Sequence, residues 1–533
     1  MTLLRTLRLC LIALPLSAGA QAATTYHVRE DGGTDIQCNG RADAPYPGSG
    51  LGKDCAWMNP MVALPPGGRP RIAGGDTLVI HAGQYMVGLG APGSSGVPAC
   101  SSSYPWECAM APVPSGPDAE HPTRILGEGH DRGCPAAPQL WGTERVRQVL
   151  SLEGTRHAQV ACLEITDHAE CAEFHTGGKA CPRETFPFGN WSSVGLYAAD
   201  SSGVQLTDLN IHGLAGRGVH AGRLRDWTLE RVRIAGNGSA GWDGDIGAQK
   251  SSNAGRMSFR KLTIEWNGCV ETWPGGKPTH CWSQSAGGYG DGMGTHQTAG
   301  DWLFEDSVFR FNTSDGLDLL YHTDEGSITV RRSWAEGNAG NQLKLAGPAV
   351  IENTVVIGTC GHFRGKPWSY KVDDCRANGD AVVFATKAAT RSRFVNNTVL
   401  SEGNVAVLAG GPAGAQLVLR NNILVGLPWF LDPDKNSADA YAEGGIALDD
   451  SHGLKQSLRN AACRGTGTKC GDAGLVSASR LRPDPHLTVN SPARSSGTAS
   501  GPEIPADDHD GRKRDRSRPV DRGAFQTNPT TPR

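Results

Sequence analysis

The feature that most constrains this chain is a short strand-like run that recurs across its middle. The runs alternate polar residues with Val, Ile, Phe and Trp, a pattern typical of β-strands. One position in each run can be aligned with the next at about 22 to 24 residues per coil, once skipped coils and inserted loops are allowed for. The aligned positions are Asp208, Arg231, Lys261, Asp306, Arg332, Asn353 and Asn397. Such a period predicts a β-solenoid, in which stacked coils bury a continuous ladder of apolar side chains.

Asparagine follows several of these runs within a few residues, and we expect it to form one corner of each coil. The residues concerned are Asn237, Asn267, Asn312 and Asn338. Leucine-rich repeats have a similar period, but they need the pattern L-x-x-L-x-L-x-x-N, which this chain lacks. With 71 glycines and 33 prolines, the chain is also a poor candidate for a helical bundle. The sequence therefore predicts an all-β solenoid.

Three regions follow one another along the chain. Residues 1–22 have the features of a cleaved signal peptide, with a basic start, a short apolar stretch and the cleavage pattern Ala20-Gln21-Ala22. Residues 23–490 are expected to form the solenoid domain with inserted loops. Residues 491–533 are expected to form a polar C-terminal tail, in which the charge run 510–518 is solvated. No stretch is long enough to span a membrane, so we expect a secreted or periplasmic protein.

Cysteine usage agrees with an exported protein. Of the 15 cysteines, Cys10 lies in the expected signal peptide, and the other 14 form seven pairs of neighbours in the sequence. Spacing does not fix connectivity, but local pairs that each close one loop are the simplest interpretation, and they fit an oxidising compartment. The pairs are Cys38/Cys55, Cys100/Cys108, Cys134/Cys162, Cys171/Cys181, Cys269/Cys281, Cys360/Cys375 and Cys463/Cys470. No C-x-x-C occurs, so structural zinc is not expected. The formal net charge of −3 gives no indication of a nucleic-acid partner.

A second series of strands carries charged residues between leucines. In Leu317-Asp-Leu319 and Leu343-Lys-Leu345, the leucines must face the core, so the residue between them faces outward. Asp318 and Lys344 are therefore expected in one outward column on adjacent coils, about 4.8 Å apart at the backbone.

Two further acids stand at the turns that lead into these strands. Asp291 precedes Met293, and Asp315 precedes Leu317, so three carboxylates are expected beside Lys344. Carboxylates clustered without His or Cys suit a hard cation such as Ca²⁺. The alternative is a solvated surface with an ordinary Asp–Lys pair.

Three segments around these residues resemble the motifs of family 9 polysaccharide lyases. They are Gly290-Asp-Gly292, Asn312-Thr-Ser-Asp-Gly-Leu-Asp-Leu319 and Gly340-Asn-Gln-Leu-Lys-Leu345. That family comprises pectate lyases on a right-handed parallel β-helix, with N-x-D-D-G-x-D followed by G-N-G-F-K-L-G. The resemblance implies this fold, here with disulfide-stapled loops. It also implies Ca²⁺ ligands at Asp291, Asp315 and Asp318 and a catalytic base at Lys344.

The chain departs from the family pattern at several positions. Ser314 stands where the family has the first acid of its D-D pair, so the expected metal set of Asp291, Ser314, Asp315 and Asp318 has one charge fewer. Gln342-Leu343 replaces Gly-Phe, and Ala346 replaces Gly. These departures leave open a polymer other than polygalacturonate, or a degenerate site.

The expected activity is that of a carbon–oxygen lyase acting on a uronate-containing, pectate-like polysaccharide. Ca²⁺ would stabilise the charge that develops as Lys344 removes the C5 proton, and the O4 bond would then break by β-elimination. An alkaline optimum and loss of activity with a chelator follow. His296, Arg310 and Arg364 are candidates to bind sugar carboxylates. The expected partner is an acidic polysaccharide, and the protein is expected to be a monomer.

Two other functions fit the same fold. A polygalacturonase-like glycoside hydrolase carries N-T-D-G-x-D, which Asn312–Asp318 matches with one insertion, but the rest of that pattern is missing. A non-catalytic glycan-binding β-helix would use the column only as structure. Replacing Lys344 by Ala separates the cases, because an enzyme loses activity while binding survives.

Overall fold

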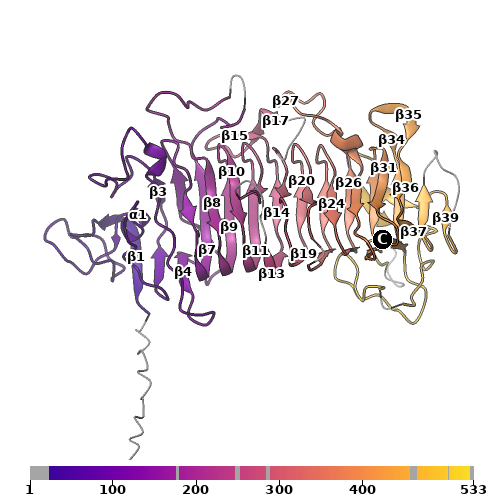
Figure 1. The fold of residues 1–533 in the computed structure, drawn as a ribbon, viewed down its shortest axis with the longest axis horizontal. Helices are drawn as coiled ribbons and strands as arrows, with labels where there is room; N and C mark the ends of the chain where they lie inside the picture. The colour runs from indigo at the N-terminus through magenta and orange to yellow at the C-terminus, as the bar shows by residue number, and fades with distance from the viewer. Residues whose placement is uncertain are drawn as a thin grey trace, which may run out of the picture.

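The computed structural model describes residues 23–175, 179–246, 253–283, 289–323, 325–456, 465–501 and 503–527. The chain winds into a parallel β-helix, and its coils stack along the longest axis of the molecule (Figure 1). Almost all strand pairs between successive coils are parallel and in register. The prediction of an all-β solenoid is confirmed.

Three parallel faces run the length of the solenoid. The face that we call the site sheet consists of β6 (Leu150–Ser151), β8 (Val194–Ala199), β10 (Arg217–Gly222), β12 (Trp242–Asp243), β18 (Met293–Gly294), β21 (Leu317–Leu319), β24 (Leu343–Ala346), β28 (Val382–Ala385), β31 (Val405–Gly411) and β36 (Ala438–Gly444).

The other two faces, the first and second ribbons, belong to one larger sheet. The first ribbon contains β1 (Thr25–Gly33), β2 (Thr77–Ile80), β4 (Thr123–Gly127), β13 (Ala254–Arg260), β19 (Asp301–Glu305), β22 (Ile328–Arg331), β25 (Ala349–Glu352), β29 (Arg391–Val395), β32 (Gln416–Arg420) and β37 (Ala447–Asp449). The second contains β3 (Gln84–Val87), β5 (Gln139–Gly142), β14 (Thr263–Glu265), β20 (Val308–Arg310), β23 (Trp334–Glu336), β26 (Val355–Gly358), β30 (Thr398–Ser401), β33 (Ile423–Gly426), β38 (Leu454–Gln456) and β39 (Lys469–Cys470). The long strands β7 (Arg156–Asp167), β9 (Ser202–His212) and β11 (Arg225–Ala235) run through both.

Short elements outside the three faces belong to loops and ends. They are α1 (Pro60–Ala63), the 3₁₀ turns η1 (Pro105–Glu107) and η2 (Arg376–Gly379), and the strands β15 (Val270–Glu271), β16 (Pro278–Thr279), β17 (Cys281–Trp282), β27 (Ser369–Lys371), β34 (Pro428–Trp429), β35 (Asp432–Asn436), β40 (Leu475–Ser477) and β41 (Asp484–Leu487). The strands β17 and β27 pair with each other, so two loops more than 80 residues apart in sequence are joined beside the solenoid (Figure 1).

A residue in the left-handed backbone conformation makes the corner between the two ribbons. Such φ angles, between 47° and 55°, occur at Asp208, Arg231, Lys261, Asp306, Arg332 and Asn353, which are six of the seven positions aligned in the sequence. The seventh aligned position, Asn397, is wrong by one residue. The pairing of Glu352 with Val395 places Asn396 opposite Asn353, and Asn396 has a φ of 54°. The sequence offers two adjacent asparagines there and no means to choose between them.

The expected asparagine corner exists as a buried hydrogen-bonded ladder. The Nδ2 of Asn237 donates to Oδ1 of Asn267 at 2.9 Å, and the same contact joins Asn267 to Asn312 at 2.9 Å and Asn312 to Asn338 at 2.8 Å. Beyond Asn338 the acceptor comes from the same coil, because Nδ2 of Asn338 donates to Oε1 of Gln342, four residues later, at 2.8 Å. Gln342 therefore supplies the last acceptor of this ladder.

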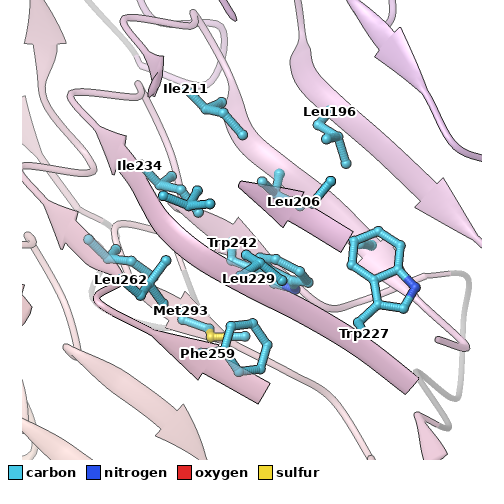
Figure 2. Close-up of a cluster of buried hydrophobic side chains, with 14 of the residues drawn as sticks. Leu196, Leu206, Ile211, Trp227, Leu229, Ile234, Trp242, Phe259, Leu262 and Met293 are labelled. Carbon is cyan, nitrogen blue, oxygen red and sulfur yellow. The ribbon is translucent and has the colours of Figure 1, made fainter. Parts of the chain in front are cut away.

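Apolar side chains from all three faces fill the solenoid. Figure 2 shows one section, in which Leu206, Leu229, Trp242 and Phe259 converge from strands of different faces. Each of these four side chains is fully buried. The core is a continuous stack, as the period predicts.

Within the part of the chain that the structure describes, six of the seven expected local disulfides are found. They join Cys38 to Cys55, Cys100 to Cys108, Cys134 to Cys162, Cys171 to Cys181, Cys269 to Cys281 and Cys360 to Cys375. Cys463 of the seventh pair lies outside the described residues. Each disulfide closes a loop at the side or end of the solenoid, as expected.

The C-terminal segment packs on the solenoid as far as it is described. Phe525 is buried against the apolar cluster of the last coils, and Asp507 pairs with Arg332 at 2.9 Å. The expectation of a solvated charge run is wrong at Arg514, which is only 5% exposed. Its guanidinium is buried because it donates to oxygens of Asn353, Asp507, Gly523 and Ala524.

Among the described residues, no helix has the length and apolar character needed to cross a membrane. The segment predicted to be a signal peptide, residues 1–22, lies outside them.

Candidate active site

The outward residues of the site sheet form one continuous column. The strand register aligns Tyr197, His220, Asp243, Gly294, Asp318, Lys344, Val383, Leu408 and Tyr441 on successive coils. Leu317, Leu319, Leu343 and Leu345 are fully buried on the opposite side of their strands. The prediction that Asp318 and Lys344 face outward on adjacent coils is confirmed, because alternation in a strand forces it.

The turns before these strands bring two more acids to the column. The backbone N–H of Asp315 donates to Oδ1 of Asp291 at 2.9 Å, and the N–H of Asn341 donates to Oδ1 of Asp315 at 2.7 Å. Each turn thus holds a carboxylate of the coil before it. Gly290 is required at the first turn, since its φ is +100° and a Cβ there would lie 2.0 Å from Oγ1 of Thr313.

Asp291, Asp315 and Asp318, the carboxylate cluster, come together as predicted. One oxygen from each lies within 4.8 Å of the others. Lys344 Nζ donates to Oδ2 of Asp318 at 2.8 Å and to Oδ2 of Asp315 at 3.2 Å. Asp291 and Asp315 are only 5% and 3% exposed, so these charges are shielded from bulk water.

The electrostatics of the cluster are unfavourable for three ionised acids. Burial, and then the charges of Asp315 and Asp318, raises the pKa of Asp291 to about 8. Burial and the charge of Asp315 raise the pKa of Asp318 to about 6. Burial alone would lower the pKa of Lys344, but Asp315 and Asp318 outweigh it, and that pKa lies above its ordinary value. One ammonium does not balance the cluster.

This donor set fits a divalent cation. The three carboxylates outnumber the ammonium of Lys344, which contacts Asp315 and Asp318, and all the acidic donors are hard oxygen ligands without His or Cys. Asp291, Asp315 and Asp318 are the residues that would hold it. Ser314, included in the predicted metal set, is fully buried, and its Oγ accepts a hydrogen bond from Nη1 of Arg376 at 2.6 Å.

The cluster forms the floor of a cavity of about 300 Å³. His296 lines this cavity, as expected of a substrate-binding residue, and its ring stacks on Tyr321 with centroids 5.5 Å apart. The other lining residues include Trp242, Asp243, Asp245, Thr295 and Arg376. The site is thus a strongly acidic hollow that contains two cationic side chains and two aromatic rings.

Two predicted substrate-binding residues lie elsewhere. Arg310 is on β20 of the second ribbon, where its Nε donates to Glu265 at 2.8 Å. Arg364 pairs with Asp374 at 3.2 Å and covers the ring of Phe430. Neither lines the cavity. Strand alternation showed that Arg310 faces outward but not on which of the three faces.

Sequence reasoning missed Arg376, the second cation of the cavity. It follows Cys375, whose disulfide with Cys360 folds the loop back toward the site sheet. In the sequence, the one indication that Arg376 lies near the site was the expected Cys360/Cys375 pair, since a disulfide there limits how far this loop can extend.

The fold is similar to those of several solved structures. They include "pectate lyase Pel9A" (14% identity, TM-score 0.44, covering 96% of this chain and 98% of that one) and a "rhamnogalacturonan lyase" (11%, 0.35, 86% and 92%). An "alginate lyase from Paenibacillus sp. str. FPU-7" is similar at 15% identity, with a TM-score of 0.33 and coverage of 70% and 92%. No family model and no curated protein sequence matches the chain. Likeness at this level concerns the fold alone, so reaction and substrate must come from the chain's own residues.

Proposed function

We propose that this protein is an exported polysaccharide lyase that cleaves a uronate-containing polymer by β-elimination. The observation that carries the proposal is a cluster of three acids, two of which contact a single lysine beside them on the outward face of the site sheet. The order and spacing of these residues resemble the family 9 lyase motifs. Ca²⁺ is the cation we propose for the carboxylate cluster.

The residues of the cavity divide the reaction between them. Ca²⁺ held by Asp291, Asp315 and Asp318 would bind the uronate carboxylate and stabilise negative charge developing beside C5. Lys344 accepts the C5 proton, the C–H electron pair forms the C4=C5 double bond, and the C4–O4 bond breaks. The departing O4 takes a proton from water. His296 and Arg376 line the same cavity and offer positive or hydrogen-bonding groups to the sugar.

Lys344 is a base only in its neutral form. In direct contact with Asp315 and Asp318 its pKa is raised, so it remains an ammonium at neutral pH. It becomes a base when those carboxylates are engaged by a cation and the pH is high. The proposal therefore requires an alkaline optimum and a cation-dependent rate.

Carboxylate spacing disfavours an inverting hydrolase. An inverting glycosidase separates its two carboxyl groups by about 6.5–9.5 Å to admit a water molecule. Here one oxygen of each acid lies within 4.8 Å of the others, and Lys344 bridges two of them.

The test is a panel of uronate polymers incubated at alkaline pH with Ca²⁺ or with a chelator. Ultraviolet absorbance of the unsaturated product is recorded together with new reducing ends. We expect a Ca²⁺-dependent absorbance rise on at least one polymer, absent with Lys344→Ala. New reducing ends without absorbance would establish a hydrolase. Binding without cleavage in both proteins would establish a glycan-binding β-helix.

A further inference from the structure

A second group of metal-ligating side chains lies at the N-terminal end of the solenoid. His27 is on β1, His81 directly follows β2, and Asp43 lies in the loop closed by the Cys38–Cys55 disulfide. Because β1 and β2 pair in parallel, the two histidines lie on neighbouring coils. One ligand atom from each of the three residues lies within 4.8 Å of the others.

The distances match those between ligands of a small metal ion. His27 Nδ1 lies 3.1 Å from His81 Nε2, and His81 Nε2 lies 3.4 Å from Oδ1 of Asp43. Zinc bonds of about 2.0–2.1 Å in tetrahedral geometry place neighbouring ligand atoms about 3.3 Å apart. Two of the three donor pairs therefore already have the spacing that such an ion requires, and the third pair lies within 4.8 Å.

The surroundings orient these ligands. The other ring nitrogen of His81, Nδ1, faces Oε2 of Glu128 at 3.4 Å, and that carboxylate also accepts from the N–H of Ala82 at 3.0 Å. A carboxylate behind a histidine is the usual partner of a metal ligand, because it directs the lone pair of the opposite nitrogen to the ion. Asp43 is oriented by Nη1 of Arg29 at 2.8 Å.

The local charge also suits a divalent ion. Asp31, Asp43 and Glu128 contribute three negative charges, and Arg29, which contacts Asp31 and Asp43, contributes one positive charge. The remainder is two negative charges beside two imidazoles. Imidazole nitrogen selects a transition metal over Ca²⁺, which sets this group apart from the all-oxygen carboxylate cluster.

We propose that His27, Asp43 and His81 form a binding site for a divalent transition-metal ion, represented by Zn²⁺, with water as the fourth ligand. The ion joins the first two coils to the disulfide-closed N-terminal loop. The lack of C-x-x-C pairs in the chain bears only on cysteine ligands, and this site uses none. Without an ion, the 3.1 Å contact is an N–H···N hydrogen bond between two imidazoles.

Zinc titration of the untagged full chain in excess Ca²⁺ tests the proposal, because Ca²⁺ would compete with Zn²⁺ for the all-oxygen carboxylate cluster. We expect one strong equivalent of Zn²⁺ and a rise in Tm. Asp43→Asn and His81→Gln should each weaken binding at least about 100-fold, and Glu128→Gln, behind the ligand, about 10- to 100-fold. His121→Ala is the matched control, since His121 contacts Asp118 at 2.8 Å without a second histidine.

A spectroscopic readout complements the titration. Co²⁺ in place of Zn²⁺ should show the intense visible bands of tetrahedral coordination, lost in Asp43→Asn. Asp43 is half-exposed, so this variant is expected to fold even if His81→Gln does not. No strong Zn²⁺ equivalent, or equal affinity in Asp43→Asn and the wild type, would overturn the site in favour of the imidazole hydrogen bond.

Discussion

The buried acid Glu265 and the buried carboxylate cluster lie in opposite electrostatic environments. On the second ribbon, Glu265 accepts from Nε of Arg233 and Nε of Arg310, both at 2.8 Å. Burial would raise the pKa of Glu265, but the two arginines outweigh it and hold that pKa below its ordinary value. At the carboxylate cluster, three acids lie together and Lys344 contacts two of them, Asp315 and Asp318, while burial raises the pKa of Asp291 to about 8.

The two environments differ in their balance of charge. At Glu265, neighbouring coils supply two cations for one acid. At the carboxylate cluster the acids outnumber the lysine that contacts them, which costs stability when no cation is bound and is typical of functional sites. This deficit of positive charge is what a cation and an anionic substrate would fill.

The largest effect is expected from Lys344→Ala. Removal of a general base lowers kcat by about 10²- to 10⁴-fold, whereas Glu265→Gln should leave kcat unchanged because it lies on another face. Steady-state rates on the active polymer measure both. Comparable losses of kcat in the two variants would show that the second ribbon matters for activity as much as the site sheet does.

Thermal stability should respond to the two acids with opposite signs. Glu265→Gln removes the charged partner of two arginines and is expected to cost about 1–3 kcal/mol. Asp291→Asn keeps the acceptor for the N–H of Asp315 and removes a buried charge that is present only above the raised pKa of about 8, so at pH 8.5 it should raise the Tm of chelator-treated protein. With Ca²⁺, the Tm of Asp291→Asn should instead lie below that of the wild type, because the variant lacks a ligand. Destabilisation by Asp291→Asn in chelator would contradict this account.

The pH dependence of stability follows from the raised pKa values. Asp291 and Asp318 release protons near pH 8 and pH 6 in the folded chain but near 3.8 when unfolded, so the folded state binds more protons in between. In chelator, stability should therefore fall as pH rises from about 4 to 8. Asp167, with a pKa of about 8 from burial, adds to the same slope.

The comparison of variants isolates the contribution of the cluster to that slope. Asp291→Asn in chelator should show a shallower slope than the wild type, and Ca²⁺ should flatten the wild-type slope, because the ion replaces the protons. Denaturant unfolding at pH 5.5 and 8.5 provides the values. Equal slopes in wild type and variant would show that Asp291 titrates normally.

The smallest effect is expected at His296 and Arg310, which could not be ranked as substrate-binding residues from the sequence. His296 lines the cavity, so His296→Ala should raise KM several-fold with little change in kcat. Arg310 is bound to Glu265 on another face, so Arg310→Ala should leave KM unchanged. A raised KM for Arg310→Ala would extend the substrate surface beyond the site sheet.

Strand alternation and period predicted most of the fold and the centre of the site. Asp318 and Lys344 could be placed because flanking leucines fix their orientation, and six corner residues because the repeat aligns them. Alternation does not tell which face a strand belongs to, which is why Arg310 was misplaced. Arg376 and Arg514 depend on loop and terminal packing, which has no period to reveal it.

The packed C-terminal segment changes how this solenoid is expected to fold. Most contacts join neighbouring coils, so winding proceeds coil by coil. The bonds of Asp507 to Arg332 and Asn353 cross 175 and 154 residues, and they form only after the intervening coils exist. Stacking of the coils and docking of the C-terminal segment are therefore separate steps of folding. A chain between these two steps has its coils in place but the corner residues Arg332 and Asn353 uncovered, so we expect the C-terminal segment to be most sensitive to proteases during this interval.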